Sequence, residues 1–297
     1  MISNLHEEKQ RTRQGNVFME NHQIEFVRLR FEEISLMNDE VFPLAEAALL
    51  IAIEAGENLD IQRYLDNLSE LAKEFTNFRK SRPKATIAKS MISFIYEESG
   101  FSGNRNNYYD PANSYLNKVI DNKVGIPVSL ALLHLSIGNQ LDIPVEGIAF
   151  PGHFLVRYVG DGGSLIDPFF GRELSTYDCK TLLKQISGGS VELDHSHFQV
   201  ATKKEILIRM IDNLKQIFWK EKKWERCQMC IEKQIFLSSH EGQFELQLGA
   251  MYEIRGNLDL AQDKYESIIT NEASDENVRS IASKRLLSLS PKPRIIH

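Results

Sequence analysis

The segment with the fewest structural options is PVSLALLHLSIGNQL, residues 127–141, which is apolar on nearly every side. Its composition predicts a helix, and Pro127 suits the first turn because the N–H that proline lacks would have no partner there. A helix without a polar face needs cover all round, so it belongs at the centre of a domain. The other elements must therefore pack around this segment.

The patterns on the two sides of the central segment differ. Before it, residues 24–78 and 86–100 carry apolar residues at helical spacing. After it come three strand-like runs with polar turns between them, VEGIAF, HFLVRYVG and GSLIDPF. Helical periodicity then returns and holds almost to the end. This order predicts an α+β domain, with a buried helix against an antiparallel sheet and a helical N-terminal part, followed by an all-α domain.

The 297 residues are enough for two domains with separate cores. We divide them into a polar tail at 1–24, an α+β domain at 25–199 and a helical domain at 200–297. The boundaries follow the change from polar to periodic sequence and the return of helical spacing.

Composition and charge narrow the partners and the cellular compartment that we expect for this chain. A net charge of -6 argues against a nucleic-acid binder, which usually has a basic surplus. Cys179, Cys227 and Cys230 form no disulfide framework and fit a reducing compartment. The longest strongly apolar run, FPLAEAALLIAIEAG, is too short to span a bilayer, and the N-terminus lacks the apolar core of a signal peptide. We therefore expect a cytoplasmic protein that binds neither nucleic acid nor membrane.

The C-terminal part contains an internal repeat. Four residues reappear after a shift of 34 positions: Leu214, Phe218, Cys227 and Ile231 correspond to Leu248, Tyr252, Ala261 and Tyr265. This period is that of the tetratricopeptide repeat, and LGAMYEIRGNLDLAQDKYESII resembles its consensus. Gly249 and Ala261 take the small positions where two helices touch, whereas Lys215 takes the first of these positions in the other copy. The repeat predicts paired helices with a groove for a peptide or a helix.

Two patterns resemble metal or redox sites, but the sequence gives each a plainer interpretation. The run CQMC, residues 227–230, has the spacing of a zinc or dithiol site, yet the repeat places Cys227 at a buried position. The run HSH, residues 195–197, could present two histidines from one face of a strand, but no thiolate lies near it. We expect core cysteines and a solvated or hydrogen-bonded histidine pair, with no metal and no cofactor.

A histidine and an aspartate mark the strand-like runs. His153 and Asp167 are 14 residues apart, with a glycine-rich turn at 160–163 between them. Two strands joined by that turn would bring the imidazole and the carboxylate side by side, which supplies two members of a nucleophilic triad. A nucleophile would be expected at a helix N-terminus, where the helix dipole lowers the pKa of a thiol. The helix that begins at Pro127 is that element.

Three stretches resemble bacterial SirB-type proteins, in which a transglutaminase-like domain of papain-like fold precedes tetratricopeptide repeats. They are YYDPANSYLNKVIDNKVGIPVSLALL, PGHFLVRY and LIDPFFGREL. Together with the repeat, the resemblance covers about residues 30–290. It implies that His153 and Asp167 match the catalytic His and Asp of the family. The catalytic Cys of the family, two residues after Gly125, is replaced by Pro127.

This replacement leaves the nucleophile in question. Ser129 is two residues further on, and at about 100° per residue its side chain points to another side of the helix. We expect its hydroxyl to satisfy free backbone groups at the helix start, with a replacement nucleophile as the alternative. His153 is either half of a structural pair with Asp167 or part of a residual binding site. The loop GNRNNYYDPANS adds Asn104, Tyr109 and Asn113, which either line the same cleft or serve as turn residues.

Three functions remain open. The first is a non-catalytic transglutaminase-like protein that acts as a regulatory or interaction module and binds a protein or peptide through its C-terminal repeats; the resemblance implies the regulatory role. The second is an amide or ester hydrolase or an acyl transferase that uses Ser129 with His153 and Asp167. The third is a pure scaffold with a vestigial cleft, in which a change at His153 affects stability alone.

Two repeats are few for an independent helical array, so we expect them to dock on the first domain. Limited trypsin digestion of the full chain should then leave no separate folded fragment of residues 200–297, as followed by mass spectrometry and circular dichroism. Release of that fragment with its helical signal intact would contradict the docking.

Overall fold

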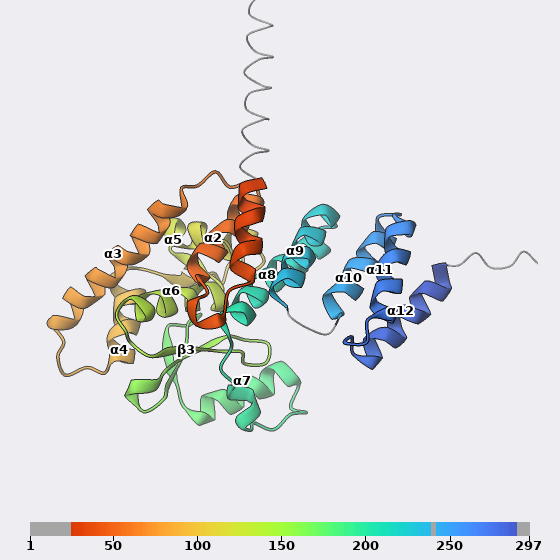
Figure 1. The fold of residues 1–297 in the computed structure, drawn as a ribbon. Coiled ribbons are helices and arrows are strands. Elements are labelled where there is room, and N and C mark those ends of the chain that lie inside the picture. Colours follow the sequence, from red (N-terminus) through yellow and green to blue (C-terminus); the bar gives the residue numbers. More distant parts are fainter. Residues whose placement is uncertain (1–24, 239–241, 290–297) are drawn as a thin grey trace, which may run out of the picture. The chain divides into compact units, whose positions relative to one another are not determined.

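The computed structural model describes residues 25–238 and 242–289, and the chain divides into two compact units between Leu207 and Ile208 (Figure 1). The proposed polar tail, residues 1–24, lies outside the described residues. Within them, no helix is both long and apolar enough to cross a bilayer.

The first unit combines helices with two small sheets. Its helical elements are a helix at 25–35, η1 (Asp39–Val41), α2 (Leu44–Glu54), α3 (Ile61–Lys80), α4 (Ile87–Ile92), the π-helical η2 (Ser93–Glu98), η3 (Pro111–Asn113), α5 (Leu116–Asn122), α6 (Pro127–Gln140), η4 (Val159–Asp161), α7 (Thr176–Ser187) and η5 (His195–Phe198). Its strands are β1 (Ser102–Gly103), β2 (Val124–Gly125), β3 (Val145–Ile148), β4 (Leu155–Tyr158), β5 (Ser164–Asp167) and β6 (Arg172–Leu174).

Helix α6 is the predicted central helix. It packs against α3, α5, β3 and β4, and its first eight residues, through His134, are all buried. Near its C-terminal end one face is less covered, because Asn139 and Gln140 are exposed and Ser136 is half-buried. The segment is thus buried over most of its length, as its composition predicts, and its exposed polar residues lie near the C-terminal end.

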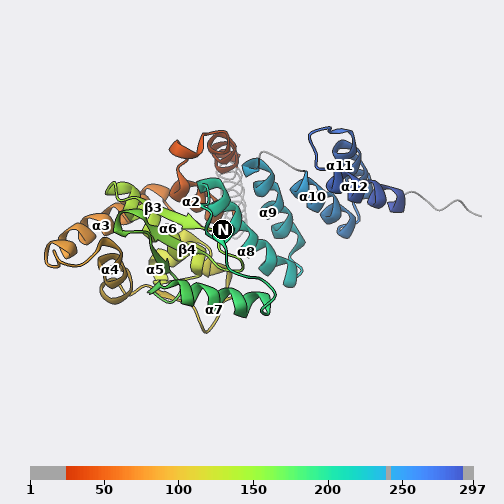
Figure 2. The ribbon, with the colours of Figure 1, turned by 90° about the horizontal axis from the view of Figure 1, so that it is seen from below.

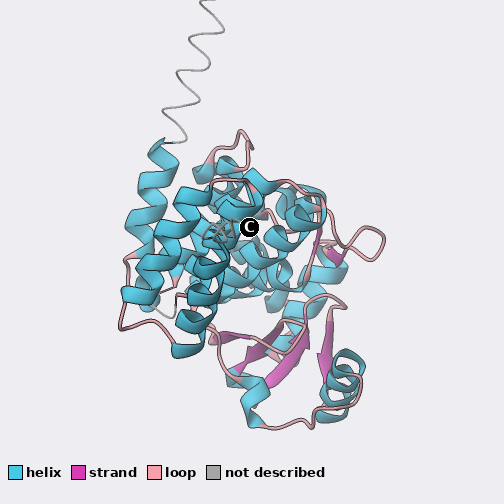
Figure 3. Cartoon of the chain, turned by 90° about the vertical axis from the view of Figure 1, so that its right-hand side faces the viewer, coloured by secondary structure: helices cyan, strands magenta, loops and turns pink. Residues whose placement is uncertain are grey.

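The main sheet is antiparallel with the strand order β3-β4-β5-β6 (Figure 3). Helix α7 packs on one face through Cys179 and Leu183, which join Ile148 and Leu155 in a buried cluster. The other face meets α6, where Tyr158 of β4 reaches the central helix. The sheet is therefore enclosed between α6 and α7.

Some sequence predictions for these elements are wrong in detail. Three strands were expected, but β6 adds a fourth, and β1 pairs with β2 in a short parallel sheet. These strands have only two or three residues, too few for a visible alternation. The run 195–197, considered above as one face of a strand, forms part of the 3-10 turn η5, capped by Asp194.

A buried hydrogen-bond chain joins α6 to the sheet and to the turn after β5. The hydroxyl of Tyr96 donates to the carbonyl of Pro168 at 2.7 Å and lies 2.9 Å from Nε2 of His134. Because that hydroxyl proton is engaged, Nε2 is assigned as the donor, and Nδ1 then accepts from the Tyr158 hydroxyl at 2.7 Å. Burial lowers the pKa of His134 to about 3, so the ring is neutral.

The second unit is all-α, as the sequence predicts. It contains the greater part of α8 (Lys203–Lys220), followed by α9 (Trp224–Leu237), α10 (Gln243–Ile254), α11 (Leu258–Thr270) and α12 (Glu276–Leu289). Consecutive helices from α9 to α12 pack on one another (Figures 1 and 2). A Cβ on Gly249 would lie 2.5 Å from the ring of Tyr265, so this crossing of α10 and α11 requires glycine. Tyr265 and Ala261 are fully buried there.

The lowered pKa of His134 predicts acid sensitivity of the fold. The unfolded chain binds a proton at this residue below about pH 6.5, whereas the folded chain does not until about pH 3. Stability is therefore lost as the pH falls from 7, by about 2 kcal/mol at pH 5 from this residue. Urea unfolding at the two pH values should show a smaller loss for His134→Gln than for the wild type.

The exposed His195 supplies the matched control. His195→Gln should keep the wild-type loss of stability between pH 7 and pH 5. Equal losses in the wild type and in His134→Gln would contradict a neutral, buried His134.

Candidate functional site

His153 lies in the turn that leads into β4, two residues before the strand begins. Pro151 and Gly152 form the centre of this turn, and the N–H of His153 donates to the carbonyl of Phe150 at 2.9 Å. Gly152 has a φ of 64°, which favours glycine, and a Cβ there would lie 2.6 Å from Ile186 of α7. The sequence predicts His153 in a strand, whereas in the structure it lies in a turn, and Gly152 of this turn packs closely against α7.

Asp167 ends β5, is 1% exposed and contacts the imidazole. Its Oδ1 lies 3.0 Å from Nε2 of His153 and accepts the backbone N–H groups of Phe169 and Phe170 at 2.9 and 3.3 Å. With Nε2 donating to the carboxylate, Nδ1 of a neutral ring is the basic nitrogen. Within the described residues Nδ1 forms no hydrogen bond. The pair is therefore an oriented base, suited to accept a proton from a nucleophile or to bind a polar group.

The N-terminus of α6 supplies no nucleophile to this base. Pro127 is the first residue of the helix and is buried. Ser129 is fully buried, and its hydroxyl donates to the carbonyl of Asn113 at 2.6 Å and accepts the N–H of Ile126 at 3.0 Å. A Cβ on Gly125 would lie 2.7 Å from the same oxygen. Ser129 therefore joins the helix start to the preceding loop, and no hydrogen bond links it to His153.

The three loop residues named as cleft candidates have different surroundings. Asn104 donates to the side chain of Asn113 at 2.9 Å, and Asn113, 2% exposed, donates to the carbonyls of Asn107 and Tyr108. These two asparagines hold the loop in shape. Tyr109, in contrast, is 58% exposed and available to a ligand.

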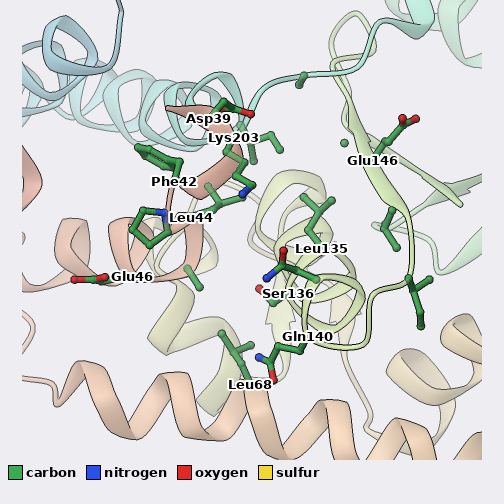
Figure 4. A pocket seen from close by; sticks show the side chains of 18 of the residues that line it. Asp39, Phe42, Leu44, Glu46, Leu68, Leu135, Ser136, Gln140, Glu146 and Lys203 are labelled. Carbon is green, nitrogen blue, oxygen red and sulfur yellow. The ribbon is translucent and has the colours of Figure 1, made fainter. Parts of the chain in front are cut away.

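A cavity of about 690 Å³ lies elsewhere in the first unit, and neither His153 nor Asp167 lines it (Figure 4). It is bounded by α2, α3, the C-terminal part of α6 and β3, through residues that include Phe42, Leu44, Leu68, Leu135, Ser136 and Gln140. Of its carboxylates, Glu46 and Glu146 are each paired with an arginine, and Asp39 accepts the backbone N–H of Lys204. The size suits a small molecule, but the lining includes no His or Cys, so the candidate site remains at His153.

The other sequence candidates show no arrangement for chemistry. Cys227 and Cys230 are buried, and burial raises the pKa of the Cys227 thiol to about 11. His197 contacts Asp194 within its own turn. In the part of the chain that the structure describes, no group of three or more His, Cys, Asp or Glu side chains could hold a metal ion.

Comparison with known proteins places the site in a family context. The model of the transglutaminase-like superfamily (Transglut_core2) matches residues 62–212, a range that contains Pro127, His153 and Asp167. A UPF0162 protein of Xylella fastidiosa (strain 9a5c) is 33% identical over 210 residues, which are 68% of this chain and 74% of the relative. No solved structure matches the chain.

More distant relatives match in part. The UPF0162 protein YchA of Escherichia coli (strain K12) is 28% identical over 239 residues, 78% of this chain and 84% of YchA. Human F-box only protein 21 is 29% identical over 183 residues, which are 52% of this chain but 28% of that protein. The similar region therefore also occurs within a much longer chain.

The position of Ser129 predicts a structural cost for its removal. Ser129→Ala leaves the carbonyl of Asn113 and the N–H of Ile126 without this partner in a buried place, which should lower the free energy of unfolding by about 1–3 kcal/mol. Ser136→Ala is the control on the same helix, because Ser136 forms no hydrogen bond among the described residues; its effect should stay within about 0.5 kcal/mol. Equal urea midpoints for the two variants would contradict this role.

Proposed function

We propose, on the premise that this chain belongs to the transglutaminase-like superfamily, that it is a non-catalytic member that acts as a regulatory protein–protein interaction module. The observation that carries the proposal is Pro127 at the start of α6, where the family resemblance expects the catalytic cysteine. Proline has no group that can attack a carbonyl.

Two other side chains that could supply a nucleophile, those of Ser129 and Cys179, are poorly suited to the role. The hydroxyl of Ser129 is engaged with backbone groups on two sides and has no access to solvent. Cys179 is buried in the cluster between the sheet and α7, and burial raises the pKa of its thiol. The burial and the hydrogen bonds of Ser129 therefore weigh against the alternative, a hydrolase or acyl transferase that uses Ser129 with His153 and Asp167.

The His153–Asp167 pair then serves as a polar site that binds instead of reacting. Its carboxylate is buried and the imidazole side chain is 11% exposed, so the ring edge is the part that a partner can reach. The third function, a scaffold with a vestigial cleft, differs from this one only in whether His153 contacts the partner.

We extend the proposal to the architecture of SirB-type proteins, with residues 25–199 as the transglutaminase-like domain and 200–297 as tetratricopeptide-like helices that bind a protein or peptide. The buried residues at the repeated positions and the close crossing at Gly249 support this assignment. Exposed apolar side chains support a binding role for these helices, since such groups are enriched where partners dock: Ile254, Leu258, Leu260 and Leu287.

A restored thiol tests the site. Pro127→Cys should create a thiol whose pKa is lowered by the helix N-terminus and by the imidazolium of His153, although burial acts in the opposite direction. Iodoacetamide at about pH 6 should alkylate this thiol much faster than Cys179, Cys227 or Cys230, as read by peptide mass spectrometry. The substitution should cost on the order of 1 kcal/mol, mainly through the unfolded chain.

Two comparisons decide the result. Adding His153→Ala to Pro127→Cys should remove most of the rate advantage. A folded Pro127→Cys protein whose new thiol reacts no faster than the native ones would contradict a thiol activated by His153 at this position. A fluorophosphonate probe should not label the wild type; labelling that disappears in Ser129→Ala would overturn the non-catalytic function.

A further inference from the structure

An exposed group of aromatic rings and guanidinium groups lies beside the His153–Asp167 pair. We call it the aromatic–arginine platform and define it as Arg105, Tyr108, Tyr109, Phe169, Phe170 and Arg172. Its members come from the loop before α5 and from the segment between β5 and the start of β6.

The rings of the platform form a continuous chain of contacts. The centroids of Phe169 and Phe170 are 5.2 Å apart, those of Tyr108 and Phe169 are 5.7 Å apart, and those of Tyr108 and Tyr109 are 5.3 Å apart. Phe170 is 47% exposed and Tyr109 is 58% exposed. Large rings held rigidly at the surface are the side chains that dominate protein interfaces.

The platform carries positive charge in a chain whose net charge is -6. The guanidinium carbon of Arg105 lies 4.8 Å from the centroid of Phe170, and that of Arg172 lies 5.9 Å from it. Within the described residues Arg105 forms no ion pair, and Arg172 has a long contact of 3.6 Å with Asp178. The donors of both guanidinium groups are thus largely available to an incoming anion.

Side chains of the loop fix the platform in shape. Asn104 accepts the N–H of Asn107, whose side chain donates to Asp110, and Asn113 donates to two loop carbonyls. A Cβ on Gly103 would lie 2.4 Å from the carbonyl oxygen of Phe169, so the loop rests directly on the segment after β5. A surface ordered before binding loses less conformational entropy when a partner docks.

The same aspartate supports the platform and the candidate site. Oδ1 of Asp167 accepts His153 Nε2 and also the backbone N–H groups of Phe169 and Phe170. The carboxylate that orients the imidazole therefore also fixes the backbone that carries Phe169 and Phe170.

We propose that the aromatic–arginine platform binds an acidic polypeptide segment, whose carboxylates pair with Arg105 and Arg172 while its apolar groups pack on Phe170 and Tyr109. This inference rests on the proposed function and names the class of partner. The charge of the platform is opposite to that of the segment. A nucleic acid is the weaker fit, because two arginines in an acidic chain offer few phosphate contacts.

Fluorescence anisotropy with the full chain tests the proposal. The probe is a fluorescein-labelled peptide of three Glu-Leu-Glu-Gly repeats, compared with the same peptide carrying glutamine or lysine in place of glutamate. The glutamate peptide should bind best, and its affinity should fall as NaCl is raised from about 50 to about 300 mM, since exposed charges are screened over this range. Arg105→Gln combined with Arg172→Gln should weaken binding about tenfold, and Phe170→Ala should weaken it several-fold.

Arg82 supplies the matched control. Its guanidinium lies 3.7 Å from the ring of Phe78, on another part of the same unit, so Arg82→Gln removes one charge of the same kind. This variant should bind the glutamate peptide as the wild type does, and thermal melts confirm that each variant is folded.

Three outcomes would overturn the proposal: no preference for the glutamate peptide, an equal loss in Arg82→Gln and the platform variants, or tighter binding of a labelled dT12 oligonucleotide than of the peptide. The thiol and fluorophosphonate experiments above report separately on catalysis. An acidic peptide that fails to bind therefore removes this partner class and leaves the non-catalytic function standing.

Discussion

Burial of α6 on almost every side is the constraint from which the rest of the first unit follows. A helix without a polar face needs both a sheet and helices as cover, and β3, β4, α3 and α5 supply them. Its two polar side chains inside the core must then find partners within the protein. Ser129 does so with backbone groups of the preceding loop, and His134 does so with two tyrosine hydroxyls.

The candidate site is assembled from the same supports. Two sets of hydrogen bonds stabilise the turn after β5. The Tyr96 hydroxyl donates to the Pro168 carbonyl, and Asp167 accepts hydrogen bonds from two backbone N–H groups and from the imidazole. Such a well-supported pair is typical of a catalytic base. The first residue of α6 is Pro127, whose ring carries no nucleophilic group.

The sequence allowed the central helix, the strands at β3 to β5, the all-α C-terminal unit and the pairing of His153 with Asp167 to be predicted, because each depends on periodicity or spacing. The short β6 and the hydrogen-bonded loop around Asn113 could not be predicted, since neither has enough residues to show a period. His134 was a missed signal: it is the one titratable residue in the apolar run, and its partners Tyr96 and Tyr158 are 38 and 24 residues away. Their meeting depends on tertiary packing.

The proline at the first position of α6 also bears on how such a chain can evolve. At this position proline breaks no helical hydrogen bond, and its fixed φ reduces the freedom of the unfolded chain. An exchange of a reactive residue for proline here removes chemistry without weakening the fold. Selection for stability alone then has no reason to reverse such an exchange.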